Sequence, residues 1–126
     1  MLSDAPLMSF IPVTDPAAAR RFYETTLGLD VVEESPHAVV LDAMGTMLRL
    51  TPVSDLLVQP FTIAGWRVGD IGKVVDGLSA LGVAFTRYEG MDQDVRGIWT
   101  TPGGDRVAWF TDPDGNTLSL TSFAAA

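Results

Sequence analysis

The chain carries one pattern twice, and this repeat restricts its possible folds more than any other feature of the sequence. Asp15 is matched by Asp70, and the pair Leu27–Gly28 is matched by Leu81–Gly82 at nearly the same distance along the chain. Self-similarity of this kind indicates a supersecondary unit that occurs more than once. We therefore expect two copies of one unit, the second lengthened by an inserted segment at about residues 89–104.

Each copy contains a helix with its own start and stop signals. In the first copy Asp15 suits the N-cap, Pro16 the first helical position and Gly28 the residue after the helix. Asp70 and Gly82 stand at the corresponding places in the second copy. Apolar residues recur at helical spacing between these signals: Ala19, Phe22, Tyr23 and Leu27 in the first copy, and Ile71, Val74, Val75, Leu78 and Leu81 in the second.

Short runs rich in β-branched and aromatic residues surround each helix and predict strands. The order in both copies is β-α-β-β-β. The expected strands are Leu7–Val13, Leu29–Glu34, His37–Asp42 and Thr46–Thr51 in the first copy, and Thr62–Val68, Val83–Tyr88, Arg106–Thr111 and Asn116–Thr121 in the second.

Turn signals separate the last two strands of each copy. Asp112–Asn116 reads DPDGN, in which the proline presets one φ angle and the glycine can take a positive φ. Met44–Gly45 is its shorter counterpart in the first copy. We expect a single domain over residues 1–126, with module one at about 6–53 and module two at about 61–123.

Composition and charge exclude several classes of protein. A chain of 126 residues that is 47% hydrophobic can bury one compact core. The net charge of −8 disfavours nucleic acid and anionic membranes as partners. This charge has two interpretations: it keeps the surface soluble and does nothing more, or it attracts a cationic ligand. Without cysteine there are no disulfides and no thiol chemistry. The start of the chain has no basic region and no membrane-length apolar run follows, so we expect a cytoplasmic protein.

Two segments carry a family resemblance. VTDPAAARRFYETTLGL (13–29) and FTDPDGNTLSL (110–120) resemble the two signatures of the vicinal oxygen chelate superfamily, which includes glyoxalase I, extradiol dioxygenases, methylmalonyl-CoA epimerase and the bleomycin resistance proteins. The resemblance implies an α+β fold of two tandem β-α-β-β-β modules that form curved mixed sheets around a ligand cup. It also implies a homodimer.

Strand alternation indicates which side chains would line such a cup. If Leu48, Leu50, Leu118 and Leu120 are buried against the helices, their neighbours along the strands point the other way. With the tryptophans of the inserted segment and the strand after it, the expected ligand-binding residues are Met8, Phe10, Met47, Arg49, Ile63, Arg67, Trp99, Trp109 and Ser119.

Two groups within this set are open to different interpretations. Arg49 and Arg67 would recognise a carboxylate, a phosphate or an aromatic ring of a ligand, or else form an ion pair with Asp42 or another acid, or lie in solvent. Trp99 and Trp109 would stack on a planar ligand or pack in the ordinary way. No catalytic residue is assigned.

The residues at the metal-binding positions of the family do not suit a metal here. Metal-dependent members that the chain resembles have His, Gln or Glu where this sequence has Met8, Arg49, Ile63 and Ser119. A thioether, a guanidinium, an alkyl chain and a neutral hydroxyl are poor ligands for a hard divalent cation. The single histidine, His37, matches no ligand position and is expected in a surface turn. We predict no metal and no other cofactor.

The sequence thus favours a metal-free protein of the glyoxalase/bleomycin resistance type that holds a small organic molecule in a partly apolar cup. The alternative is a glyoxalase- or dioxygenase-like enzyme, that is a lyase, isomerase or oxidoreductase, acting in the same cup with or without a divalent metal. In that case Arg49 would polarise a carbonyl group. A third interpretation is a domain whose cup is filled by its own side chains and which associates with a partner.

Overall fold

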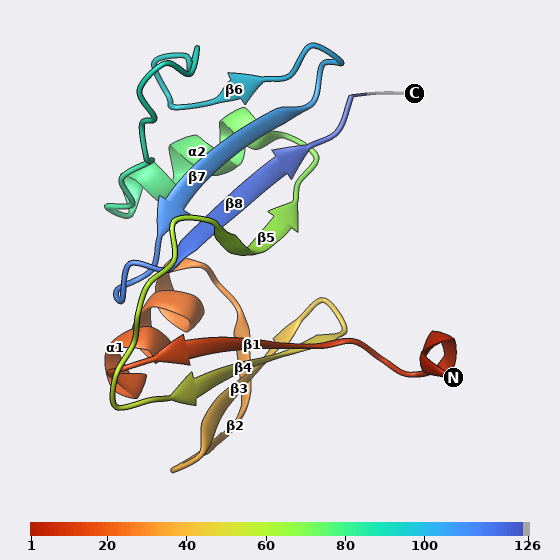
Figure 1. The fold of residues 1–126 in the computed structure, drawn as a ribbon, viewed down its shortest axis with the longest axis vertical. Helices are drawn as coiled ribbons and strands as arrows, with labels where there is room; N and C mark the ends of the chain where they lie inside the picture. Colours follow the sequence, from red (N-terminus) through yellow and green to blue (C-terminus); the bar gives the residue numbers. More distant parts are fainter. Residues whose placement is uncertain (125–126) are drawn as a thin grey trace. The chain divides into compact units, whose positions relative to one another are not determined.

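The computed structural model describes residues 1–124, which form two compact units. The first unit spans Met1–Leu57, and the second begins at Val58. Each unit contains a four-stranded mixed sheet, with strand order β1-β4-β3-β2 in the first and β5-β8-β7-β6 in the second (Figure 1). The α+β fold with two β-α-β-β-β modules is therefore confirmed.

In the first unit a helical segment joins β1 to β2 at the opposite edge of the sheet, and β1 pairs with β4 in parallel. A short 3-10 turn, η1 (Leu2–Asp4), precedes the sheet. The unit consists of β1 (Met8–Val13), α1 (Pro16–Arg20), the π-helical turn η2 (Arg21–Thr26), β2 (Asp30–Ser35), β3 (Ala38–Ala43) and β4 (Thr46–Pro52).

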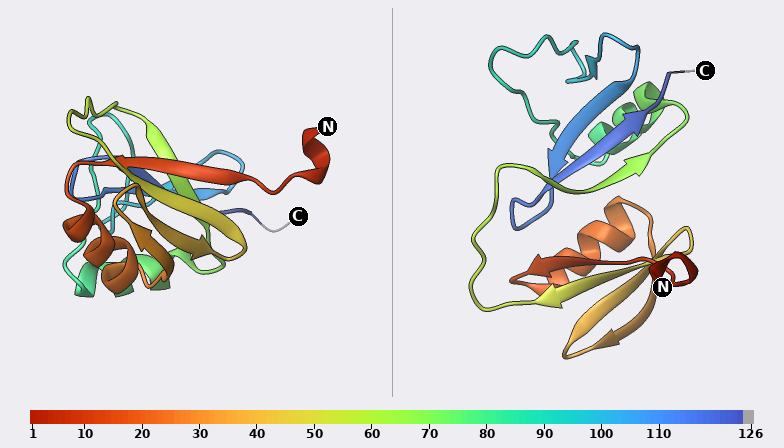
Figure 2. Two further views of the ribbon diagram at one scale, coloured as in Figure 1. Left: turned by 90° about the horizontal axis from the view of Figure 1, so that it is seen from below. Right: turned by 45° about the vertical axis from the view of Figure 1, so that its right-hand side comes forward.

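The second unit repeats this order, with β5 and β8 as the parallel pair. Figure 2 shows α1 against one face of the first sheet and α2 against one face of the second. The unit consists of β5 (Thr62–Arg67), α2 (Ile71–Ala80), β6 (Trp99–Thr100), β7 (Arg106–Thr111) and β8 (Thr117–Ser122).

The two helical segments, α1 with η2 in the first unit and α2 in the second, begin and end close to where the sequence predicts. The Asp15 carboxylate accepts a hydrogen bond from the Ala18 amide at 3.1 Å, and the Asp70 carboxylate accepts one from Lys73 at 3.1 Å. These bonds satisfy backbone donors that the first turn of a helix leaves free. Gly28 and Gly82 follow the helices with positive φ angles of 79° and 94°. The sequence signals do not indicate the π-helical geometry of η2.

Contacts between α1 and the strands agree with the predicted leucine pattern. Leu48 and Leu50 of β4 are buried, and Leu50 pairs with the buried Ile11 of β1 on the same face of the sheet. Tyr23 of η2 is fully buried as well. Arg20 forms an ion pair with Glu24 at 3.2 Å and a second with Glu34, which ties α1 to β2. The hydrogen bond to Glu24 is the largest of the contacts that raise the pKa of Arg20.

The predicted strand over 83–88 is wrong. This segment forms no strand, and β6, inside the inserted segment, lies beside β7 instead (Figure 1). The physical reason is the Gln93 side chain, which accepts a hydrogen bond from the Tyr88 amide at 2.8 Å and donates one to the Thr86 carbonyl at 2.9 Å. Two backbone groups that a strand would use for its ladder, the Tyr88 amide and the Thr86 carbonyl, are thus bonded to a side chain instead.

The two hairpin turns differ in their backbone strain. Asp112 is buried, and its carboxylate accepts hydrogen bonds from the amides of Asp114 and Asn116, at 3.0 and 2.9 Å. In the first unit Met44 and Gly45 join β3 to β4, and Met44 has a φ of 50° although it is not glycine. A two-residue hairpin turn with both φ angles positive favours Asn-Gly, so Met44 is an unfavourable residue for its position.

Replacing Met44 with asparagine should therefore stabilise the protein. The Met44 side chain is fully exposed, so its loss removes no packing. We expect Met44→Asn to raise the free energy of unfolding by about 1 kcal/mol, because asparagine adopts the left-handed conformation more readily. Urea denaturation would measure the change, and Met44→Val, which is branched at Cβ, should shift the stability in the opposite direction.

Across residues 1–124, no helix combines the length and apolarity that crossing a lipid bilayer requires.

Candidate functional site

The face of the second sheet opposite α2, which we call face B, collects several of the predicted ligand-binding residues. Ser119 of β8 pairs with Gly65 on one side and Trp109 on the other, so these three residues share one row. The next row contains Arg67 and, across the sheet, Trp99. Side chains that pair directly across a sheet point to the same face. Face B therefore holds Arg67 and Ser119, as strand alternation predicts, together with Trp99 and Trp109.

Three aromatic rings lie together on this face. The indoles of Trp99 and Trp109 stack with ring centroids 6.3 Å apart and an interplanar angle of 30°. The Tyr88 ring meets Trp109 edge-on, with centroids 5.3 Å apart and an angle of 89°. Both indoles are only half-buried, and Tyr88 is exposed. We call Tyr88, Trp99 and Trp109 the aromatic cluster; it offers flat, partly solvent-exposed surface to a planar molecule.

Small residues continue the row beside Trp109. Ser119 is buried, and a Cβ atom added to Gly65 would lie 2.5 Å from the Ser119 Oγ atom. Glycine is therefore needed at position 65 for this hydroxyl to keep its place. The result is a polar group next to the aromatic cluster that could orient a ligand by a hydrogen bond.

Arg67 and Ile63 lie at the other edge of the second sheet, on β5. The Arg67 guanidinium lies over the ring of Phe123, with its central carbon 5.1 Å from the ring centroid. This contact is a cation–π interaction within the unit. The pairing of β5 with β8 shifts register between Thr62 and Ala64, so strand alternation assigns Ile63 to neither face.

The face of the first sheet opposite α1, face A, carries the remaining predicted residues. Met8 pairs with Met47, and Phe10 pairs with Arg49. Met8, Phe10 and Met47 are exposed, whereas Arg49 is half-buried. Within residues 1–124, no carboxylate forms an ion pair with Arg49, so the alternative pairing with Asp42 is not found.

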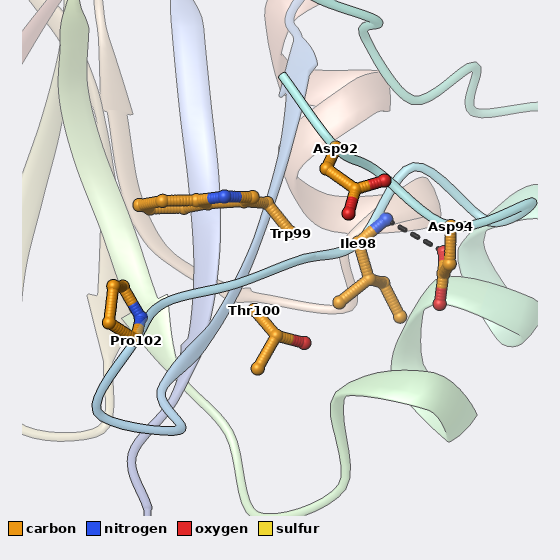
Figure 3. Close-up of a pocket in the computed structure, with 6 residues that line it drawn as sticks. All are labelled: Asp92, Asp94, Ile98, Trp99, Thr100 and Pro102. Atoms are coloured by element: carbon orange, nitrogen blue, oxygen red, sulfur yellow. Dashed lines mark hydrogen bonds between the residues drawn. The ribbon is translucent and has the colours of Figure 1, made fainter.

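A pocket that the sequence did not reveal lies next to the aromatic cluster. It has a volume of about 460 Å³ and borders the inserted segment and β6 (Figure 3). Its lining residues are Asp92, Asp94, Ile98, Trp99, Thr100 and Pro102. Trp99 thus belongs both to the aromatic cluster and to the wall of this pocket.

Hydrogen bonds from side chains give the inserted segment its shape. One oxygen of Asp94 accepts from the amides of Arg96 and Ile98, both at 2.9 Å. Arg96 in turn forms a two-pronged ion pair with Asp76 of α2, at 2.9 and 2.8 Å. The segment is therefore fixed to the helix of its own unit. No spacing rule in the sequence indicates these contacts, because they depend on an irregular path of the backbone.

The residues present do not fit a divalent metal ion. Met8, Arg49, Ile63 and Ser119 occupy the positions that match the family's metal ligands, and none of them supplies a carboxylate or imidazole. In the described part of the chain, no three His, Asp or Glu side chains gather as a metal site would require. His37 lies exposed in the turn between β2 and β3, as predicted.

Comparisons with known proteins agree with this fold. A family model described as Glyoxalase/Bleomycin resistance protein/Dioxygenase superfamily matches residues 6–120. No curated protein sequence matches the chain. Among solved structures, a member of the same superfamily from Sphaerobacter thermophilus DSM 20745 is 25% identical, with a TM-score of 0.74 and coverage of 98% of this chain and 100% of that one.

Two further structures share the fold at lower identity. TnmS3, an antibiotic binding protein from Streptomyces sp. CB03234, is 23% identical, with a TM-score of 0.70 and coverage of 98% and 99% of the two chains. Lactoylglutathione lyase from Agrobacterium tumefaciens is 18% identical, with a TM-score of 0.73 and coverage of 94% and 93%. The similar structures therefore include both a binding protein and an enzyme.

Proposed function

Since the chain belongs to the Glyoxalase/Bleomycin resistance protein/Dioxygenase superfamily, we propose that it is a metal-free protein that binds a small organic molecule. The ligand has a planar aromatic part, which lies against face B. The aromatic cluster carries this proposal, because two stacked and half-exposed indoles are supported by a third ring from a separate segment. Ser119, the buried hydroxyl beside Trp109, supplies a polar contact.

Several observations support binding without catalysis. The residues that match the family's metal ligands lack suitable donor atoms, and the aromatic cluster contains no group that readily accepts a proton at neutral pH. The similar fold of an antibiotic binding protein agrees with this role.

We also propose that the protein is a homodimer and that it is located in the cytoplasm. Light scattering would test the dimer, because the molar mass in solution should be twice that of one chain. Met8, Phe10, Met47 and Arg49 on face A remain predicted ligand contacts.

Removing one indole should weaken ligand binding. We expect Trp99→Ala to raise the dissociation constant for a planar tricyclic probe about tenfold, which corresponds to about 1.4 kcal/mol of lost stacking. Isothermal titration calorimetry with 9-aminoacridine and with anthraquinone-2-sulfonate would measure this, since the two probes share a planar shape but differ in charge. Equal affinity in the variant and the original protein would contradict the proposal.

Trp66 provides the matched control for this experiment. It pairs with Leu120 and therefore lies on the face of the sheet that packs against α2. Trp66→Phe keeps an aromatic ring there and should leave both dissociation constants unchanged. A loss of binding in this variant as well would mean that the effect of Trp99→Ala reflects damage to the sheet.

Arg49 favours a second candidate function, catalysis on a carbonyl compound. It is half-buried and has no ion pair within residues 1–124, so its guanidinium is free to polarise a carbonyl oxygen. Turnover of the methylglyoxal–glutathione adduct or of a catechol, abolished in Arg49→Ala, would support this function. Binding of a planar probe without any turnover would favour the first candidate.

A further inference from the structure

We propose that the pocket beside Trp99 receives a positively charged group, such as a protonated amine, of the ligand that stacks on the aromatic cluster. The inference rests on the proposed function and adds a charge requirement to it. It comes from the composition of the pocket wall, which combines two carboxylates with an indole, an isoleucine and a proline: Asp92, Asp94, Trp99, Ile98 and Pro102.

The position of Trp99 links the pocket to face B. Its ring stacks on Trp109, and the same residue lines the pocket. Figure 3 shows Asp92 between Trp99 and Asp94, with Pro102 beyond the indole. A planar molecule on the aromatic cluster would therefore have a substituent at the edge of Trp99 within reach of a carboxylate.

Of the two carboxylates, Asp92 is the one available to a ligand. Asp94 already accepts hydrogen bonds from the amides of Arg96 and Ile98, and its second oxygen faces Arg106 at 4.0 Å. Within residues 1–124, the Asp92 carboxylate has no hydrogen bond and no ion pair. Its charge is consequently not neutralised by the protein.

The surroundings strengthen the preference for a cation. The chain has a net charge of −8, which raises the local concentration of cations and repels anions. Ile98, Trp99 and Pro102 contribute apolar atoms to the pocket wall, and an indole face also attracts cations. Because Asp92 is itself exposed, the ion pair would contribute modestly, as pairs at protein surfaces do.

The two tricyclic probes test this directly, since 9-aminoacridine is cationic at neutral pH and anthraquinone-2-sulfonate is anionic. We expect Asp92→Asn to weaken binding of the cationic probe about fivefold and to leave binding of the anionic probe unchanged or slightly stronger. Higher salt should weaken the cationic probe's binding to the original protein more than to the variant. The measurement is again isothermal titration calorimetry.

Glu89→Gln is the control, because it removes one negative charge from the same segment at an exposed residue outside the pocket wall. If Asp92→Asn and Glu89→Gln have equal effects on the cationic probe, the charge requirement is wrong although the proposed function stands. If neither probe binds the original protein, the proposed function fails and this inference fails with it.

Discussion

Phe110→Ala should reduce the free energy of unfolding by about 3–5 kcal/mol, because it empties the centre of the second unit. The Phe110 side chain is fully buried on β7 and lies opposite the fully buried Leu118 of β8. Its ring also meets that of Phe85, with centroids 5.6 Å apart. Urea denaturation followed by circular dichroism would measure the loss.

The same substitution should release the segment 83–88 from the sheet. Phe85 belongs to this segment, which is held to β7 by a hydrogen bond of 2.7 Å from the Thr86 amide to the Trp109 carbonyl. Faster hydrogen exchange at Thr86 would report the release. Phe61→Ala, at a phenylalanine whose side chain is 58% exposed, should change stability by less than about 0.5 kcal/mol. Similar losses in both variants would show that Phe110 is not central to the core.

Asp112→Ala should cost about 3 kcal/mol of stability, because it removes the carboxylate that accepts three hydrogen bonds within the β7–β8 turn. Asp112 accepts from the amides of Asp114 and Asn116, and its other oxygen accepts from the Asn116 side chain at 2.9 Å. Both Asp112 and Asn116 are buried, so water does not readily replace the lost bonds.

A graded series makes this prediction specific to hydrogen bonding. Asp112→Asn keeps an oxygen that can accept from the two backbone amides but brings an amide group toward the Asn116 amide. Its loss should be about half that of Asp112→Ala. Thermal unfolding of both variants would rank them, and an alanine variant as stable as the asparagine variant would contradict the assigned role of the carboxylate.

The parts of the fold governed by local rules could be predicted from the sequence. Asp15 and Asp70 cap their helices, and the buried leucines of β4 and β8 place Arg49 and Ser119 on the opposite faces. These features follow from interactions within a few residues or from the two-residue period of a strand.

The parts that depend on contacts across an irregular segment could not be predicted. β-branched and aromatic residues indicate a strand over 83–88, but the Gln93 side chain bonds the Tyr88 amide and the Thr86 carbonyl of this segment. The pocket has no periodic signal either, because turns in the inserted segment bring Asp92 and Pro102 to one wall. The register shift at Ile63 similarly breaks the alternation from which its orientation was inferred.

Gln93 has a consequence for how tightly any ligand can be held. Its side-chain oxygen accepts a hydrogen bond from the Tyr88 amide, and its side-chain nitrogen donates to the carbonyls of Thr86 and Gly97. These bonds fix the backbone near two of the three aromatic residues, Tyr88 and Trp99. A surface that is already rigid loses little entropy when a molecule settles on it. Gln93 can thus contribute to ligand affinity without contacting the ligand. Substitutions at position 93 would change that affinity while the atoms that contact the ligand stay the same.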